Sequence, residues 1–106
     1  DVSQEGVAPT APISPTAEIR GTTYVLQGGE LVKQARADVY AYDSSGYLVA
    51  RTVSDAEGLY SIGLEPGTYT VVGETWIDSD RYSRSYNGVR AFADLVTNLN
   101  IVMYKN

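Results

Sequence analysis

The chain has 106 residues, with 8 basic and 13 acidic side chains, a formal net charge of −5, and neither Cys nor His. A chain of this length forms one domain around one modest core. The lack of Cys and His excludes thiol and imidazole nucleophiles, disulfides and the usual structural zinc sites. Without a run of Lys or Arg, nucleic-acid binding is not expected, and no apolar stretch approaches the roughly 20 residues of a membrane-spanning helix.

The first residue is Asp1 rather than Met. We interpret this as the mark of a processed, secreted protein whose signal peptide has been removed. An excised fragment of a longer protein is the alternative.

Residues 1–16 form a Pro-rich segment ahead of a domain that spans residues 17–106. Such a composition is typical of a linker, but from residue 7 to residue 19 every odd-numbered position is apolar. These residues are Val7, Pro9, Ala11, Ile13, Pro15, Ala17 and Ile19, whereas the even-numbered positions are mostly polar and carry Ala8, Thr10, Pro12, Ser14, Thr16 and Glu18. This period of two predicts an extended segment with one buried face, and its prolines favour a sheet edge or a groove over a central strand. We predict a donor strand whose Val7, Pro9, Ala11 and Ile13 enter a neighbouring subunit; packing on its own domain is the alternative.

The remaining sequence shows no helical period, and turn-forming residues recur about every 8 to 12 residues, which is typical of all-β domains. Seven strands are predicted, at Ala17–Leu26, Ala35–Tyr42, Tyr47–Ser54, Leu59–Leu64, Thr68–Ile77, Tyr82–Phe92 and Asn98–Tyr104. The inward-facing residues are predicted to be Ala37, Val39, Ala41, Tyr60, Ile62, Leu64, Tyr69, Val71, Leu99, Ile101 and Met103.

Three turn signals separate or interrupt these strands. Asp55 and Gly58 occupy the first and fourth positions of a type I turn. Pro66-Gly67 predicts a type II turn, in which the glycine has a positive φ. Asn87-Gly88 predicts a tight turn that interrupts the sixth strand.

The spacing of these residues resembles that of the carboxypeptidase regulatory-like domains. The residues that match the pattern of that family are Ile19, Gly21, Gly29, Leu31 or Val32, Ala37, Val39, Ala41, Thr52, Asp55, Gly58, Tyr60, Ile62, Leu64, Pro66, Gly67, Tyr69 and Val71. The resemblance implies a seven-stranded transthyretin-like (prealbumin-like, Ig-like) β-sandwich. The matching residues are structural in that family, so the resemblance implies no catalytic residue.

A more distant resemblance is to the Cna-B-like domains of surface pilins and adhesins. Those domains form a Lys–Asn isopeptide bond that is promoted by a buried acid on the strand after the Pro-Gly turn. Here Glu74 lies five positions after Tyr69, which places it on the opposite face of the strand. The first strand carries Gln27 and no Lys, so an isopeptide bond is not expected.

Five aromatic residues are candidates for surface contact: Tyr40, Tyr42, Trp76, Tyr82 and Tyr86. Exposed Tyr and Trp are enriched at protein interfaces and stack on sugars, but in a chain with one Phe some Tyr must also fill the core. Glu74, Asp78 and Asp80 offer oxygen ligands near a loop, although their spacing favours a solvated polar loop over a calcium site.

We therefore predict a non-enzymatic extracellular structural protein at the cell surface. It would be a subunit of a filament or pilus-like assembly, joined head to tail by donation of the N-terminal strand. The alternative is an accessory interaction module, or a carbohydrate-binding module, of a larger secreted protein. No cofactor, metal or catalytic residue is expected.

Overall fold

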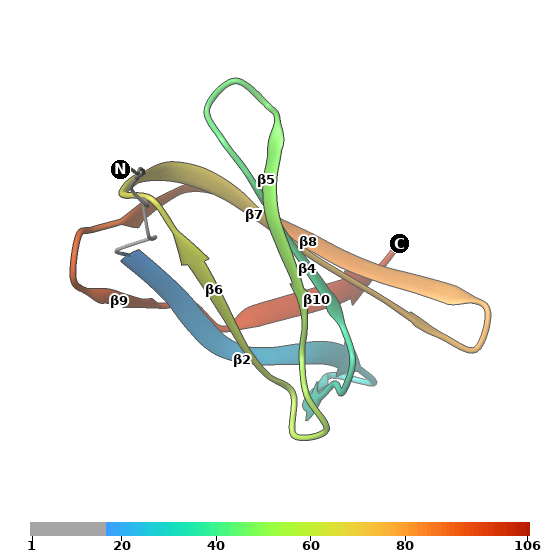
Figure 1. Ribbon diagram of the computed structural model, residues 1–106. Coiled ribbons are helices and arrows are strands. Elements are labelled where there is room, and N and C mark those ends of the chain that lie inside the picture. Colours follow the sequence, from blue (N-terminus) through green and yellow to red (C-terminus); the bar gives the residue numbers. More distant parts are fainter. Residues whose placement is uncertain (1–16) are drawn as a thin grey trace, which may run out of the picture.

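The computed structural model describes residues 17–106, so the predicted donor segment lies outside the described residues. The described chain is all-β, which confirms that part of the fold prediction (Figure 1). Its strands are β2 (Ala17–Gln27), β3 (Glu30–Lys33), β4 (Asp38–Tyr42), β5 (Leu48–Val53), β6 (Leu59–Leu64), β7 (Gly67–Ile77), β8 (Asp80–Ala91), β9 (Val96–Asn98) and β10 (Ile101–Lys105). They form a curled mixed sheet in the order β3-β2-β10-β8-β7-β4-β5, with β6 and β9 also joined to β2.

Strand β2 organises the sheet because its two halves have different partners. Its first half pairs antiparallel with β6 and parallel with β9. Its second half pairs antiparallel with β3 and parallel with β10. In Figure 1, β6 and β9 accordingly lie beside the left half of β2, and β10 lies beside its right half. The strand therefore connects two sets of neighbours, and the sheet curls around the core.

The core is built from alternate residues of six strands, as the period-two pattern predicts. Its buried members are Ala17, Ile19, Val25, Ala37, Val39, Ala41, Tyr60, Ile62, Leu64, Tyr69, Val71, Tyr82, Ala91, Ile101 and Met103. All predicted inward-facing residues belong to this set except Leu99, which is partly buried and packs against it.

Two Asp–Gly turns have the same geometry. In each, the carbonyl of the Asp accepts the N–H of the Gly at 3.0 Å, between Asp43 and Gly46 and between Asp55 and Gly58. Both glycines have a positive φ, of 88° and 83°. A carboxylate oxygen of Asp55 also accepts the N–H groups of Glu57 and Leu59, each at 2.9 Å. The predicted type I turn is therefore confirmed, and the Asp side chain fixes it locally.

The other two turn predictions are wrong. Gly67 is not among the described glycines with a positive φ, and it already belongs to β7, so Pro66-Gly67 is not a type II turn. Asn87 and Gly88 do not end a strand either, because β8 continues through them. The two residues lie opposite Thr70 alone, where the register between β7 and β8 shifts. This is a β-bulge, and the φ of +69° at Gly88 suits a glycine there.

Strands β3 and β9 are not among the seven predicted. Gly28 and Gly29 both have a positive φ, which lets β3 fold back tightly on β2. The predicted last strand is divided into β9 and β10, both parallel to β2. At the division, a Cβ on Gly21 would lie 2.0 Å from the carbonyl oxygen of Leu99, so the two backbones approach as only glycine permits.

The predicted second strand begins late, at Asp38 rather than at Ala35. Arg36, in the turn before it, has a φ of +58°, which no regular strand accommodates.

Candidate functional site

The predicted aromatic contact residues do not form one surface. Tyr82 is buried and belongs to the core, so its assignment as a contact residue is wrong. Tyr86 is partly buried, and its hydroxyl oxygen accepts the N–H of Val102 at 2.9 Å. Trp76 is 59% exposed near the tip of the β7–β8 hairpin. Because these three side chains have different surroundings, they offer no flat aromatic platform for a sugar.

Tyr40 and Tyr42 do lie together, on the outward face of β4. Their ring centroids are 6.5 Å apart, and both rings are half-buried. Arg51 of β5 covers the Tyr40 ring at 5.5 Å and forms an ion pair with Asp38 at 3.5 Å. Burial, with a smaller contribution from the charge of Asp38, raises the pKa of Tyr40. The two tyrosines therefore pack against neighbouring side chains on the outward face of β4 and β5, and less of their surface is free to contact a partner.

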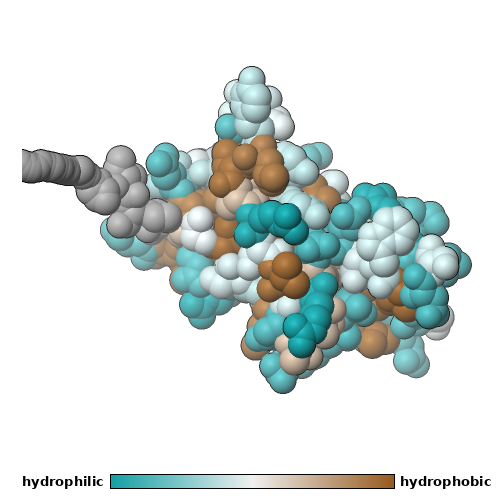
Figure 2. Space-filling view, turned by 45° about the vertical axis from the view of Figure 1, so that its right-hand side comes forward, coloured by the Kyte–Doolittle hydropathy of each residue, from teal (hydrophilic) through white to brown (hydrophobic). Residues whose placement is uncertain are grey.

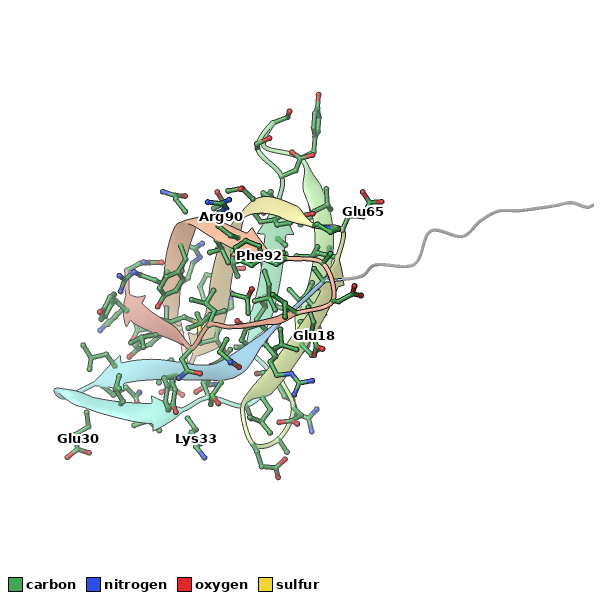
Figure 3. All side chains as sticks on the ribbon, turned by 90° about the vertical axis from the view of Figure 1, so that its left-hand side faces the viewer. Glu18, Glu30, Lys33, Glu65, Arg90 and Phe92 are labelled. Atoms are coloured by element: carbon green, nitrogen blue, oxygen red, sulfur yellow. The ribbon has the colours of Figure 1, made fainter. Side chains whose placement is uncertain are left out.

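A second cation–π arrangement lies on β8 and β10. The guanidinium of Arg84 is 5.0 Å from the ring centre of Tyr86 and 4.9 Å from that of Tyr104. Arg90 lies 5.6 Å from the ring of Phe92, and Figure 3 shows these two side chains next to each other. The guanidinium groups of Arg84 and Arg90 therefore already contact aromatic residues of the same domain.

The candidate calcium ligands pair with cations. A carboxylate oxygen of Glu74 lies 2.5 Å from Nε of Arg81, and one of Asp80 lies 3.4 Å from Nζ of Lys105. Within residues 17–106, no three acidic side chains come together as a metal site would require. Asp78, with a φ of +57°, forms the turn between β7 and β8. This arrangement is that of a polar hairpin end.

A buried polar cluster joins β2, the β3–β4 connection and the β5–β6 turn, and the sequence analysis did not predict it. The hydroxyl of Thr23 lies 2.7 Å from the carbonyl oxygen of Gln34 and 3.0 Å from the hydroxyl of Ser54. Ser54 in turn accepts the N–H of Ala37 at 2.8 Å. Thr23 and Ser54 are both buried, and both hydroxyl groups form hydrogen bonds within the domain. A small polar residue in an otherwise apolar inward row was the available signal for this cluster.

On the opposite, exposed face of β2, Glu18 is held by two neighbours. Its carboxylate accepts the hydroxyl of Ser61 at 2.6 Å and pairs with Arg20 at 2.9 Å. These contacts, the hydrogen bond from Ser61 first, lower the pKa of Glu18. The hydrogen bond from Ser61 connects the exposed faces of β2 and β6, which already pair along six positions.

Apolar side chains reach the surface in separate patches between hydrophilic ones, as the face in Figure 2 shows. Several of them lie on edge strands: Leu31 and Val32 on β3, Leu48, Val49 and Val53 on β5, Leu59 on β6, and Val96 on β9. Glu30 and Lys33 flank the apolar pair of β3, and Figure 3 shows both charged side chains directed away from the sheet. Flanking charges of this kind discourage strand addition at an edge.

The sheet is open between β5 and β6. Within residues 17–106, β5 pairs with β4 alone and β6 with β2 alone, although the Asp55–Gly58 turn connects them. Figure 1 shows the two strands diverging from that turn. A cavity of 660 Å³ has Thr52, Val53, Tyr60 and Ser61 in its lining, and another of 430 Å³ is lined in part by Val49 and Leu64. We call this opening, bounded by Leu48–Val53 and Leu59–Leu64, the β5–β6 seam.

Comparison with protein families finds no match for this chain, and comparison with curated proteins finds none. Among solved structures, the Bacillus anthracis TIE protein is similar, with a TM-score of 0.57 and 13% sequence identity. The similar region covers 83% of this chain and 17% of that protein. At this identity the likeness concerns the fold alone.

No helix in the described part of the chain is long and apolar enough to cross a membrane.

Proposed function

We propose that this chain is a non-enzymatic structural protein of the cell exterior, a subunit of a filament or surface assembly. In this proposal the domain is a transthyretin-like β-sandwich of the carboxypeptidase regulatory-like kind. Each subunit donates its N-terminal segment to the next, and Val7, Ala11 and Ile13 enter a groove of that neighbour. A contact of this head-to-tail type need not close on itself, so it generates a filament.

The supporting observation is the phase of the apolar pattern. In β2, the odd-numbered Ala17 and Ile19 are buried, whereas Glu18 and Arg20 between them face outward. In the segment 7–15 every odd-numbered position is likewise apolar, and only Ala8 and Pro12 are apolar at even-numbered positions. A linker has no need of such one-sided alternation, whereas a strand that adds to a sheet does. Burial of three apolar side chains would contribute a few kcal/mol per junction, at about 25 cal/mol per Å².

The experiment is negative-stain imaging with size-exclusion chromatography of the full chain and of residues 17–106. We expect the full chain to form filaments and the shortened chain to remain a folded monomer, with circular dichroism as the check of folding. Filaments formed by the shortened chain would contradict the proposal.

Two substitutions in the full chain provide a matched comparison. Ile13→Asp places a charge on the apolar side of the segment, and Ser14→Asp places the same charge on the other side. Assembly should be lost with the first and retained with the second. Equal loss in both variants would indicate that charge alone, rather than a buried side chain, controls assembly.

An accessory interaction module of a larger secreted protein is the second candidate function. The observation that favours it is that the similar region of the TIE protein is a small part of a much longer chain. A full chain that stays monomeric at all concentrations, with its segment 1–16 cleaved readily by proteases, would support this candidate instead.

A further inference from the structure

We propose that the β5–β6 seam is the acceptor groove, and that it binds residues Val7–Ile13 of a second copy of this chain. This inference rests on the proposed function and adds to it the site at which the donated strand is bound. The donor would form a strand between β5 and β6, and so join two of the edges that the described domain leaves unpaired.

The dimensions of the seam fit this occupant. Strands β5 and β6 have six residues each, which is about 20 Å at roughly 3.3 Å per residue. The alternating run Val7–Ile13 has seven residues and nearly the same length when extended. The other edges are shorter, since β3 has four residues and β9 has three.

The positions of the prolines also fit a strand with neighbours on both sides. Along a strand, backbone N–H groups point alternately to one neighbour and to the other. Within residues 7–14, Pro9 removes one N–H from the odd-numbered set and Pro12 removes one from the even-numbered set. The donor can therefore still direct three of four backbone N–H groups toward β5 and three of four toward β6.

Part of the core remains slightly exposed along the seam. The three inward side chains of β6, Tyr60, Ile62 and Leu64, are 4–5% exposed, and Tyr69 beside the wider end is 9% exposed. By contrast, Val39 and the other inward residues of β4 are fully buried. An apolar row laid along β6 would remove this remaining exposure from water.

The run Val7–Ile13 carries no charged side chain that could repel the charged residues of the seam. Asp43 and Glu65 line the wider end of the seam, and Asp55 and Arg20 line the end at the turn. Residues 7–16 of the donor contain no charged side chain, so like charges are not brought together in the seam.

The test uses cysteine cross-linking, because the natural chain has no Cys. The full chain carries Thr10→Cys, on the even-numbered side of the donor, together with Ser61→Cys on the exposed side of β6. The control carries Thr10→Cys together with Leu31→Cys, on the exposed edge strand β3. Both are treated with a short bismaleimide, whose reach tolerates a register shift of about two residues along the strand.

We expect a ladder of dimers and larger oligomers on a denaturing gel for the Ser61 pair, and none for the Leu31 pair. A ladder from the Leu31 pair alone would place the acceptor at β3 and overturn the inference. A cross-linked monomer from the Ser61 pair would show that the segment binds its own domain, which also overturns it.

Imaging of the same samples before cross-linking separates the two proposals. Filaments that depend on residues 1–16 but give no ladder with the Ser61 pair would show that the β5–β6 seam is not the acceptor groove. The proposed function would then remain intact. If the uncross-linked full chain forms no filaments and no oligomers, then both proposals fail.

Discussion

The hydroxyl of Tyr60 donates a hydrogen bond to the carbonyl oxygen of Leu99, 2.6 Å away. Tyr60 lies on β6, and Leu99 lies between β9 and β10, on the other side of β2. The N–H of Leu99 bonds to the carbonyl of Arg20, and the side-chain oxygen of Asn100 accepts the N–H of Thr22. These bonds fix the crossing at which the parallel strand beside β2 is interrupted, and they explain why β9 and β10 are two strands.

Tyr60→Phe should lower the free energy of unfolding by about 1 to 3 kcal/mol, because it leaves a carbonyl without its donor in a partly buried site. Urea denaturation followed by circular dichroism measures this change. Tyr47→Phe is the matched control, since Tyr47 is 71% exposed and should be neutral. Equal midpoints for the two variants would show that the bond to Leu99 contributes nothing to stability.

Alkaline pH should reduce stability through the same residue. Burial, with a smaller contribution from Tyr86, raises the pKa of Tyr60 above its ordinary value of 10.0. The unfolded chain therefore loses this proton first, so the stabilisation is complete below about pH 10 and is lost as the pH rises further. Urea midpoints from about pH 9 to pH 11.5 should fall more steeply for the natural chain than for Tyr60→Phe. Parallel curves would contradict this, since Tyr40 and Tyr69 titrate in both proteins.

Thr23→Val should destabilise the domain by about 1 to 3 kcal/mol, although it keeps the size and the β-branched shape of the side chain. It removes the hydroxyl between Gln34 and Ser54, so their buried polar groups lose a partner. Thr22→Val, at the next position and on the other face of β2, should change stability by less than about 0.5 kcal/mol. Thermal unfolding of both variants distinguishes the buried cluster from a general effect of Thr in β2.

Gly21→Ala and Gly67→Ala should have opposite outcomes. At Gly21 a methyl group meets the Leu99 carbonyl at 2.0 Å, and a loss of about 3 kcal/mol or more is expected. At Gly67 the nearest atom, of Tyr69, is 3.5 Å away, which is an ordinary contact. That variant should be neutral or up to about 1 kcal/mol more stable. A large loss of stability in Gly67→Ala would instead indicate that Gly67 has the positive φ of a type II turn.

Much of the fold follows from the period-two pattern. Each predicted strand corresponds to at least one observed strand, and buried and exposed residues alternate most regularly in β4 and β6. The errors arise where a local signal has two structural solutions. Asn87-Gly88 suits a tight turn and a bulge equally well, and only the ten paired positions of β7 with β8 decide for the bulge.

The candidate contact residues were harder to predict because tyrosine occurs both in the core and at the surface of a β domain. Tyr82 stands between the polar residues Arg81 and Ser83 and yet is buried, whereas Tyr40 is half-exposed beside Arg51. The β5–β6 seam could not be predicted at all. Two strands joined by an Asp–Gly turn would normally pair as a hairpin, and their divergence depends on β6 pairing with β2 instead.

The parallel pairing of β2 with β10 also determines when the domain can form during synthesis. Thr23 lies beside Ile101, a partner 78 positions later in the chain. Hairpins such as β7–β8 can form as soon as they leave the ribosome, but β2 gains this neighbour only after nearly the whole described chain has emerged. Such distant pairings slow folding, because the entropy cost of closing a long loop comes before the stabilising contacts form. Until then the core lacks Ile101 and Met103, so part of its apolar surface stays open to contact with other chains.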